Sequence, residues 1–336
     1  MACSPDSPQT IVRCPECSDE TDGTFLNLAS NPFARWPLAL LLTSLITWGC
    51  SADETSGTQD DVAGDGEESA SQPARGVFAE VNGTRLFYDV KGTGEPLVLI
   101  SGGSLDLRLW DEQFEAFAQD RQVIRYDPRG IGKSDLPKGP FSHARDLYAL
   151  LQFLGIQETD VLGFSFGGGV AIDFVLTYPE VVRKLILIAP GLSSWKDEIT
   201  PALGELSKVA EGEGAAKAIE LILADPSMPT EEQETARQKM SQILSENTHL
   251  FDSNFAYVRF MEPNDPPAID RLAEIGAPTL LVVGERDHAA IHENVDKLQG
   301  GIGGAKKVLI MGAGHMINLE KPHEFNRVVL NFLNTD

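Results

Sequence analysis

Ser165 stands between two glycines in the segment Gly163-Phe164-Ser165-Phe166-Gly167. The segment follows a short apolar run and opens a stretch with helical character, so the chain must turn sharply at the serine. A hydroxyl held on such a turn stands clear of the sheet edge and can attack a carbonyl carbon. The flanking glycines let strand and helix approach each other closely. We therefore expect Ser165 to be a nucleophile.

An acid and a histidine follow the serine along the chain, each at the end of an apolar run. Residues 280–283 lead into Asp287, and residues 308–311 lead through Gly-Ala-Gly into His315. A histidine beside the serine would take the hydroxyl proton during attack and return it to the leaving group. We expect His315 to be this general base and Asp287 to orient it. Glu285 is the alternative orienting acid.

A tetrahedral intermediate needs two preorganised N–H donors for its negative oxygen. One donor should be the backbone N–H of Phe166, directly after the nucleophile. The other should come from the loop Ser101-Gly102-Gly103-Ser104, which follows an earlier apolar run. Glycine allows close approach to the substrate oxygen, so Gly103 is the expected donor and Ser104 the alternative.

The remaining polar residues of these loops are expected to be structural. Asp127 and Arg129 lie in the segment DPRGIGKS, which we interpret as a buried turn brace near Ser165. His288 and His292 are expected to face solvent from a loop and a helix. No cluster of ligand-type residues in the sequence supports a metal or organic cofactor, and water is the only co-substrate implied.

The elements that must position these residues alternate along the chain from residue 77 onward. Several short runs are continuously apolar, which is typical of strands buried on both faces of a parallel sheet flanked by helices. Apolar residues recur at helical spacing between the runs and predict core-facing helices. The expected strands cover residues 86–90, 97–100, 122–126, 160–164, 184–188, 279–283 and 307–311.

One catalytic domain is expected over residues 77–336, with a helical insertion at about residues 192–271. The insertion breaks the alternation with Ala-, Glu- and Lys-rich segments. Excursions longer than about 15 residues are usually covers or disordered, and this helical composition favours a cover. We therefore predict a helical cap over the site.

Residues 1–50 form an N-terminal extension that ends in an apolar run, residues 36–48, followed by Gly49-Cys50. The run is shorter than the roughly 20 residues of a spanning helix, which favours a lipoprotein signal with Cys50 as the lipidated residue. Residues 51–76 are acidic, Gly- and Ser-rich, and predict a disordered linker. An exported, membrane-anchored protein is expected, with a cytoplasmic protein as the alternative. Cys14 and Cys17 have the spacing of half a zinc site or a redox motif, without a second pair.

The 336 residues contain 42% hydrophobic and 23% charged residues, as in ordinary globular proteins with a sizeable core. Their formal net charge is −23. Such a surface repels phosphate backbones, so we expect no nucleic-acid partner. The oligomeric state stays open.

Together these motifs resemble the α/β-hydrolase superfamily. The stretches SGGSLDLRLWDEQ, RYDPRGIGKSD and VLGFSFGGG are similar to its 3-oxoadipate enol-lactonase and carboxylesterase branch. The chain departs from that branch at Ser101-Gly102, where Ser-Asn is common, which makes a general esterase the broader expectation. A serine at the turn also differs from the carboxylate nucleophile of haloalkane dehalogenases and epoxide hydrolases, and Phe166 differs from the tryptophan of proline iminopeptidases.

The resemblance implies an α/β-hydrolase fold and an acyl-enzyme mechanism on a small carboxylic ester or lactone. Two alternatives remain open. One is a protein of the same fold that binds a ligand with little or no turnover. The other is a hydrolase of C–C or amide bonds.

Overall fold

A computed structural model describes residues 76–192, 200–251, 260–262 and 264–335 of the protein. The predicted N-terminal extension, with Cys14, Cys17 and Cys50, lies outside the described residues, as does the predicted linker up to residue 75. Positions 193–199 and 252–259 of the predicted cap also lie outside them.

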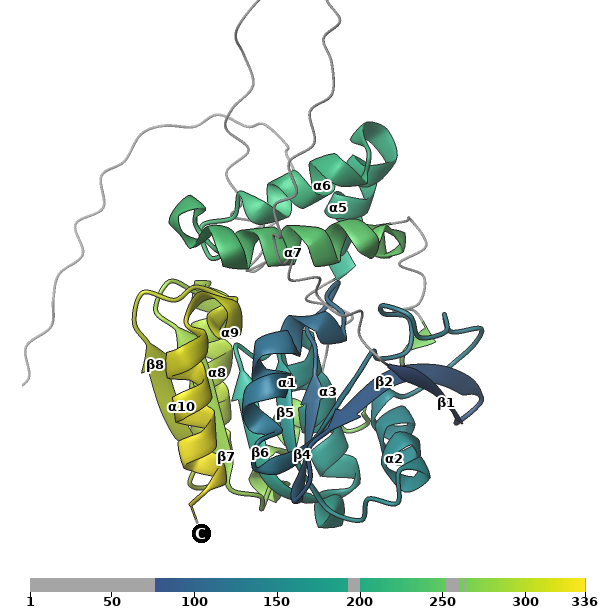
Figure 1. Cartoon of the computed structure of the whole chain (residues 1–336), viewed down its shortest axis with the longest axis vertical. Coiled ribbons are helices and arrows are strands. Elements are labelled where there is room, and N and C mark those ends of the chain that lie inside the picture. The colour runs from purple at the N-terminus through teal and green to yellow at the C-terminus, as the bar shows by residue number, and fades with distance from the viewer. Residues whose placement is uncertain (1–75, 193–199, 252–259, 263, 336) are drawn as a thin grey trace, which may run out of the picture.

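An eight-stranded sheet forms the centre of the domain (Figure 1). Its strands are β1 (Val77–Val81), β2 (Thr84–Lys91), β3 (Glu95–Ile100), β4 (Arg121–Tyr126), β5 (Thr159–Phe164), β6 (Val182–Ile188), β7 (Thr279–Gly284) and β8 (Lys306–Ile310). They lie in the order β1-β2-β4-β3-β5-β6-β7-β8. The pairs β1–β2 and β2–β4 are antiparallel, and every other pair is parallel. This topology confirms the predicted mostly parallel sheet.

Helices cover both faces of the sheet. On the face turned to the viewer in Figure 1, α1 (Asp111–Phe117) packs against α10 (Pro322–Leu333). On the other face, α2 (His143–Phe153) packs against α3 (Phe166–Thr177). The helix α8 (Ala289–Gly301) contacts β7 and β8, and the short α9 (Ile317–Glu320) contacts α10. Every residue of β5 and β7 is buried, as expected for strands with a helix layer on each side.

Three further helices lie over one edge of the sheet, at the top of Figure 1: α5 (Thr200–Glu213), α6 (Ala215–Leu223) and α7 (Glu234–Glu246). The helix α7 contacts the short 3-10 helix Leu107–Trp110, which follows the carboxyl end of β3. These helices therefore stand over the carboxyl ends of the parallel strands, the edge at which α/β proteins bind ligands. None of the helices in the described part of the chain has the length and apolar character needed to cross a membrane.

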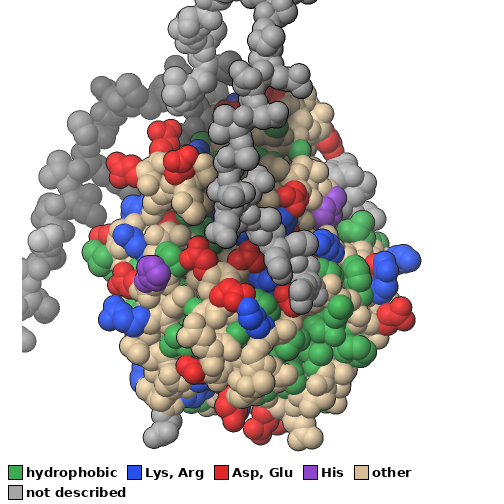
Figure 2. Space-filling view, in the orientation of Figure 1, with side chains coloured by type: hydrophobic (Ala, Val, Ile, Leu, Met, Phe, Trp, Pro, Cys, Tyr) green, Lys and Arg blue, Asp and Glu red, His purple; other side chains and the backbone are tan. Residues whose placement is uncertain are grey.

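The first strand, β1, was not among the seven that the sequence predicts. It forms a hairpin with β2 through Asn82 and Gly83, whose φ angles are 47° and 70°. Figure 2 shows acidic and basic side chains interspersed over one face of the molecule, with an apolar area on the side of β1, β2 and α2. Val77, Phe78 and Phe153 are exposed on these elements. Ala79, Leu86 and Phe87 of the same hairpin are buried, so the hairpin is exposed on one face and joins the core with the other.

Candidate active site

Ser165 occupies a tight turn between β5 and α3. Its φ and ψ angles are 51° and −110°, a conformation that costs a non-glycine residue free energy and is concentrated at functional sites. A Cβ atom on Gly163 would overlap the carbonyl group of Gly167, so only glycine lets the end of β5 and the start of α3 come this close. The N–H of Ser165 donates to the carbonyl of Ile188 at 2.8 Å, which fixes the turn to β6.

His315 and Asp287 lie side by side in the loops that follow β8 and β7. Nδ1 of the imidazole lies 3.1 Å from each carboxylate oxygen of Asp287. The Asp287 side chain is fully buried, and 12% of the His315 side chain is exposed. Oδ1 of Asp287 also accepts the backbone N–H of His288 at 2.8 Å. An N–H at Nδ1, donated to this carboxylate, leaves Nε2 of His315 as a proton acceptor.

Glu285, the alternative orienting acid, contacts a different group. Its Oε2 accepts the backbone N–H of Gly312 at 2.8 Å. Asp287 is therefore the acid whose carboxylate faces the imidazole of His315.

The ring of Phe164 connects His315 to the turn that carries Ser165. Its centroid lies 5.0 Å from that of the His315 imidazole, and Phe164 directly precedes Ser165 in the chain. Ser165, Asp287 and His315 all follow parallel strands, so they share the carboxyl edge of the sheet. The structure thus brings the three predicted residues to one edge.

The predicted oxyanion loop packs against the same turn. A Cβ atom on Gly102 would lie 3.5 Å from Cβ of Ser165, and one on Gly103 would lie 3.7 Å from Cβ of Phe166. Ser104 has a φ angle of 63°, in the left-handed region. Gly103 therefore lies close to Phe166, the other predicted donor.

The segment around Asp127 braces these loops, as expected. Oδ1 of Asp127 accepts the N–H of Leu107 at 2.8 Å, and Oδ2 accepts the N–H of Lys133 at 2.9 Å. Burial, reinforced by the nearby charge of Asp106, raises the pKa of Asp127 to about 7. Arg129 forms a buried ion pair with Asp146.

His288 is only partly exposed, at 33% of its side chain, and makes contacts that the prediction of a solvent-facing residue did not include. Its Nε2 lies 2.9 Å from Oγ of Ser227 and 3.1 Å from Oδ1 of Asp225, both in the connection after α6. The hydrogen bond with Asp225 raises the pKa of His288 although partial burial opposes the shift. The residue therefore links the Asp287 loop to the chain that follows α6. His292, on α8, is half-buried.

Two contacts to the His315 loop were not anticipated from the sequence. The backbone N–H of His315 donates to the carbonyl of Ser227 at 2.6 Å. The carboxylate of Glu320 accepts the N–H groups of Gly314 and Met316. Glu320 ends the largely apolar segment MINLE, and an acidic residue in such a segment could have indicated a buried structural carboxylate. No local pattern indicates that the carbonyl of Ser227 contacts the His315 loop.

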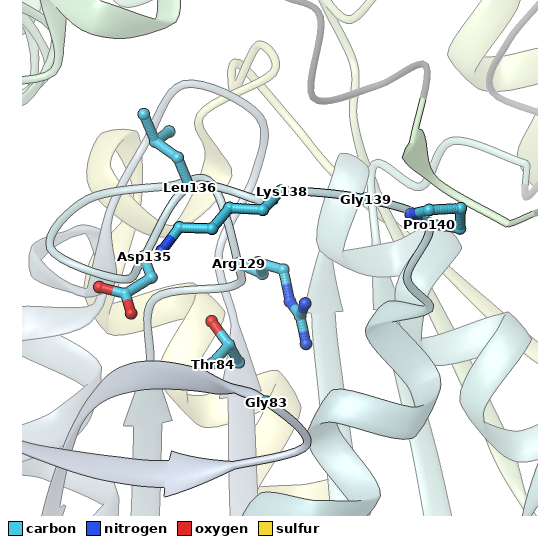
Figure 3. Close-up of a pocket in the computed structure, with 8 residues that line it drawn as sticks. All are labelled: Gly83, Thr84, Arg129, Asp135, Leu136, Lys138, Gly139 and Pro140. Carbon is cyan, nitrogen blue, oxygen red and sulfur yellow. The ribbon is translucent and has the colours of Figure 1, made fainter.

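A pocket of ≈ 220 Å³ lies away from these residues, between the β1–β2 hairpin and the loop after β4 (Figure 3). None of the predicted site residues lines it. Its lining comprises Gly83, Thr84, Arg129, Asp135, Leu136, Lys138, Gly139 and Pro140. Among the residues that the structure describes, no group of three or more His, Cys, Asp or Glu side chains could hold a metal ion.

Comparisons with known proteins agree with this architecture. A sequence model of the family described as alpha/beta hydrolase fold matches residues 95–322. The 2-hydroxy-6-oxo-6-phenylhexa-2,4-dienoate hydrolase of Comamonas testosteroni is 29% identical over 74% of this chain and 91% of that protein. The 2-hydroxy-6-oxononadienedioate/2-hydroxy-6-oxononatrienedioate hydrolase of Burkholderia vietnamiensis is 31% identical over 79% of this chain and 96% of its own length.

Solved structures share the same architecture. The enol-lactonase from Burkholderia xenovorans LB400 superposes with a TM-score of 0.66 at 24% identity, over 77% of this chain and 100% of that chain. This likeness concerns the fold.

Proposed function

The chain belongs to the α/β-hydrolase family, and from this premise we propose that it is a serine hydrolase that cleaves a small carboxylic ester or lactone. Ser165 is the nucleophile, His315 the general base and Asp287 the acid that orients the imidazole. The backbone N–H groups of Phe166 and Gly103 stabilise the negative oxygen of the intermediate.

The proposed reaction has two halves. Oγ of Ser165 attacks the carbonyl carbon while Nε2 of His315 takes the hydroxyl proton. The tetrahedral oxyanion accepts hydrogen bonds from the two backbone N–H groups. The imidazolium then protonates the leaving alkoxide, and the acyl group stays on Ser165. In the second half, Nε2 of His315 takes a proton from water, whose oxygen attacks the acyl carbon. The imidazolium then returns this proton to Oγ of Ser165 as the bond to the acyl carbon breaks and the acid leaves.

One observation carries this proposal. Ser165 holds a strained conformation at the head of α3, on the sheet edge where His315 Nδ1 lies 3.1 Å from both oxygens of Asp287. A serine held at such a cost on the same sheet edge as a paired imidazole is expected of a nucleophile. A merely structural turn would have no need of either feature.

Hydrolysis of p-nitrophenyl acetate by the wild type and by Ser165→Ala tests the proposal. Loss of a triad nucleophile should lower kcat on the order of 10⁴-fold or more. A fluorophosphonate probe followed by peptide mapping should label Ser165. Equal rates in both proteins, with no labelled peptide, would favour a ligand-binding protein of the same fold.

A second candidate reaction is C–C bond hydrolysis, which the names of the two bacterial relatives favour. The test offers 2-hydroxy-6-oxo-6-phenylhexa-2,4-dienoate and p-nitrophenyl acetate to the same enzyme preparation. A kcat/KM for the dienoate at least about 100-fold above that for the ester, a difference near 2.7 kcal/mol in transition-state binding, would favour the C–C reaction. The reverse ratio supports the ester proposal.

We further propose that the protein is exported and carries a lipid on Cys50. The support is the apolar run 36–48, which ends in Gly49-Cys50 and precedes a polar, acidic linker. Radiolabelled palmitate fed to a producing bacterium should label the wild type and leave Cys50→Ala unlabelled. Label that persists in Cys50→Ala would exclude this site.

A further inference from the structure

The carboxylate of Glu320 holds the chain on both sides of His315. Its Oε2 accepts the N–H of Gly314 at 2.9 Å, and its Oε1 accepts the N–H of Met316 at 3.1 Å. The Glu320 side chain is fully buried. Hydrogen bonds to an ionised acceptor are roughly twice as strong as neutral ones, so the backbone N–H groups of the residues before and after His315 are held by one buried carboxylate.

Arg286 connects the same carboxylate to the loop of the orienting acid. Its Nη2 donates to Oε2 of Glu320 at 2.6 Å, and Arg286 directly precedes Asp287. A buried carboxylate needs such a partner because an unpaired buried charge is strongly destabilising. The ion pair therefore joins the loops that carry Asp287 and His315.

The chain that follows α6 completes this arrangement. Nη1 of Arg286 donates to the carbonyl of Pro226 at 2.9 Å, and the N–H of His315 donates to the carbonyl of Ser227 at 2.6 Å. Three consecutive N–H groups, those of residues 314 to 316, thus have acceptors outside their own loop. The position of His315 therefore depends on Glu320 and on the carbonyl groups of Pro226 and Ser227, which follow α6.

We propose that Glu320 and Arg286 are positioning residues that set the imidazole of His315 between Asp287 and Ser165. This inference rests on the proposed function of these three residues. Neither Glu320 nor Arg286 contacts substrate; both act through the backbone of the His315 and Asp287 loops. Because a displacement of about 1 Å in a reacting group can cost about 100-fold in rate, a loosened loop should lower the rate of the chemical step.

The variant Glu320→Gln tests the proposal. Glutamine keeps one acceptor oxygen and replaces the other with an NH₂ group, so at least one of the three donors to Glu320 loses its partner. We expect kcat for p-nitrophenyl acetate to fall about 10- to 100-fold and KM to change less than about threefold. Rates are expressed per active site, titrated with a fluorophosphonate, so that unfolded protein does not contribute.

Asp160→Asn is the matched control. Asp160 is also a buried carboxylate paired with an arginine, Arg121, at 2.8 Å, but it lies at the start of β5, the opposite end of that strand from Ser165. Both variants should unfold at lower temperature than the wild type. Only Glu320→Gln should lose kcat per titrated site. An unchanged kcat in Glu320→Gln would overturn the proposal.

Arg286→Lys provides a second test if Glu320→Gln does not fold. Arg286 is 30% exposed, and lysine keeps its charge. The single ammonium group of lysine cannot replace the two guanidinium nitrogens that donate to Glu320 and to Pro226. We expect kcat to fall about 3- to 10-fold at nearly constant KM, because only part of the support is lost. Wild-type kcat in this variant would count against the proposal.

A spectroscopic measurement separates this inference from the proposed function. The proton on Nδ1 of His315, held by Asp287, should give a low-field NMR signal in the wild type. The signal should shift or broaden in Glu320→Gln and stay in place in Asp160→Asn. If the wild type hydrolyses no ester, the proposed function fails. The positioning role is tested separately by the NMR signal: a signal that is unchanged in Glu320→Gln rejects it.

Discussion

A Cβ atom on Gly167 would lie 2.6 Å from the carbonyl oxygen of Ser101, and still closer to that of Ile100. Gly167 is in the first turn of α3, and Ser101 begins the predicted oxyanion loop after β3. The missing side chain therefore lets the helix behind Ser165 rest directly on the backbone of the neighbouring strand. This contact sets how near the donor loop stands to the nucleophile.

Gly167→Ala should accordingly damage both the fold and the site. The added carbon meets backbone atoms that cannot move independently, so we expect a loss of about 3 kcal/mol in the free energy of unfolding, the upper end for overpacking. Urea denaturation measures this loss, and the folded fraction should hydrolyse p-nitrophenyl acetate more slowly.

Gly300→Ala is the control for this substitution. Gly300 lies in α8, and a Cβ atom there would meet nothing within 4 Å. Because alanine favours a helix more than glycine does, the free energy of unfolding of this variant should rise by about 0.5–1 kcal/mol. Equal stability of the two variants would mean that the contact between α3 and β3 is not tight.

Asp287→Asn should abolish most of the activity while Glu285→Gln should not. Asparagine at 287 can present an NH₂ group to Nδ1 of His315, which favours the wrong tautomer; such a change lowers kcat by about 10⁴-fold in a serine triad. The Glu285 carboxylate accepts the backbone N–H of Gly312, away from the imidazole. A larger loss of kcat in Glu285→Gln than in Asp287→Asn would reverse the assignment of the two acids.

Local patterns in the sequence were sufficient to predict most of the sheet. Each of the seven predicted strands overlaps an observed one, because strands buried on both faces are marked by continuous apolar runs. The hairpin strand β1 was missed because Val77 and Phe78 are exposed and carry no such signal. The dipeptide Asn82-Gly83, with both φ angles positive, was a usable sign of a tight hairpin turn.

The residues that support the site were harder to predict for a different reason. Ser165, Asp287 and His315 each follow a recognisable apolar run, so topology alone brings them to one edge. The contacts of His288 with Asp225 and Ser227 join segments about 60 residues apart, which no local periodicity encodes. His288 was therefore predicted to face solvent.

Asp146→Asn should destabilise the fold without changing the chemistry. Asp146 accepts two hydrogen bonds from Arg129, at 2.6 and 2.8 Å, and both side chains are buried. Removing one partner of a buried pair leaves the other charge uncompensated, which typically costs about 3–5 kcal/mol. Urea denaturation should show this loss, and kcat of the folded protein should stay at the wild-type value.

The exposed pair between Arg85 and Asp135 gives the comparison for that variant. Solvent screens such pairs, so Asp135→Asn should cost less than about 1 kcal/mol. The interpretation of Asp146 as part of a buried brace would be wrong if both variants unfolded at the same urea concentration.

The hydrogen bond between His288 and Asp225 should make stability depend on pH. It raises the pKa of His288, with a smaller contribution from Asp287. Hydrogen bonds from His288 and Ser227 lower the pKa of Asp225 although burial opposes this. A histidine with a raised pKa stabilises the fold fully below its ordinary pKa of about 6.5, and this contribution is lost as the pH rises through the raised value.

His288→Gln should therefore be less stable than the wild type near pH 6, and the difference should shrink near pH 8.5. Since a third of the His288 side chain is exposed, the pH-dependent part should not exceed about 1 kcal/mol. Urea midpoints at both pH values measure it. His292→Gln, on the helix α8 that follows His288, is the control for loss of a nearby imidazole. A constant difference for His288→Gln would show that His288 holds the chain after α6 without being charged.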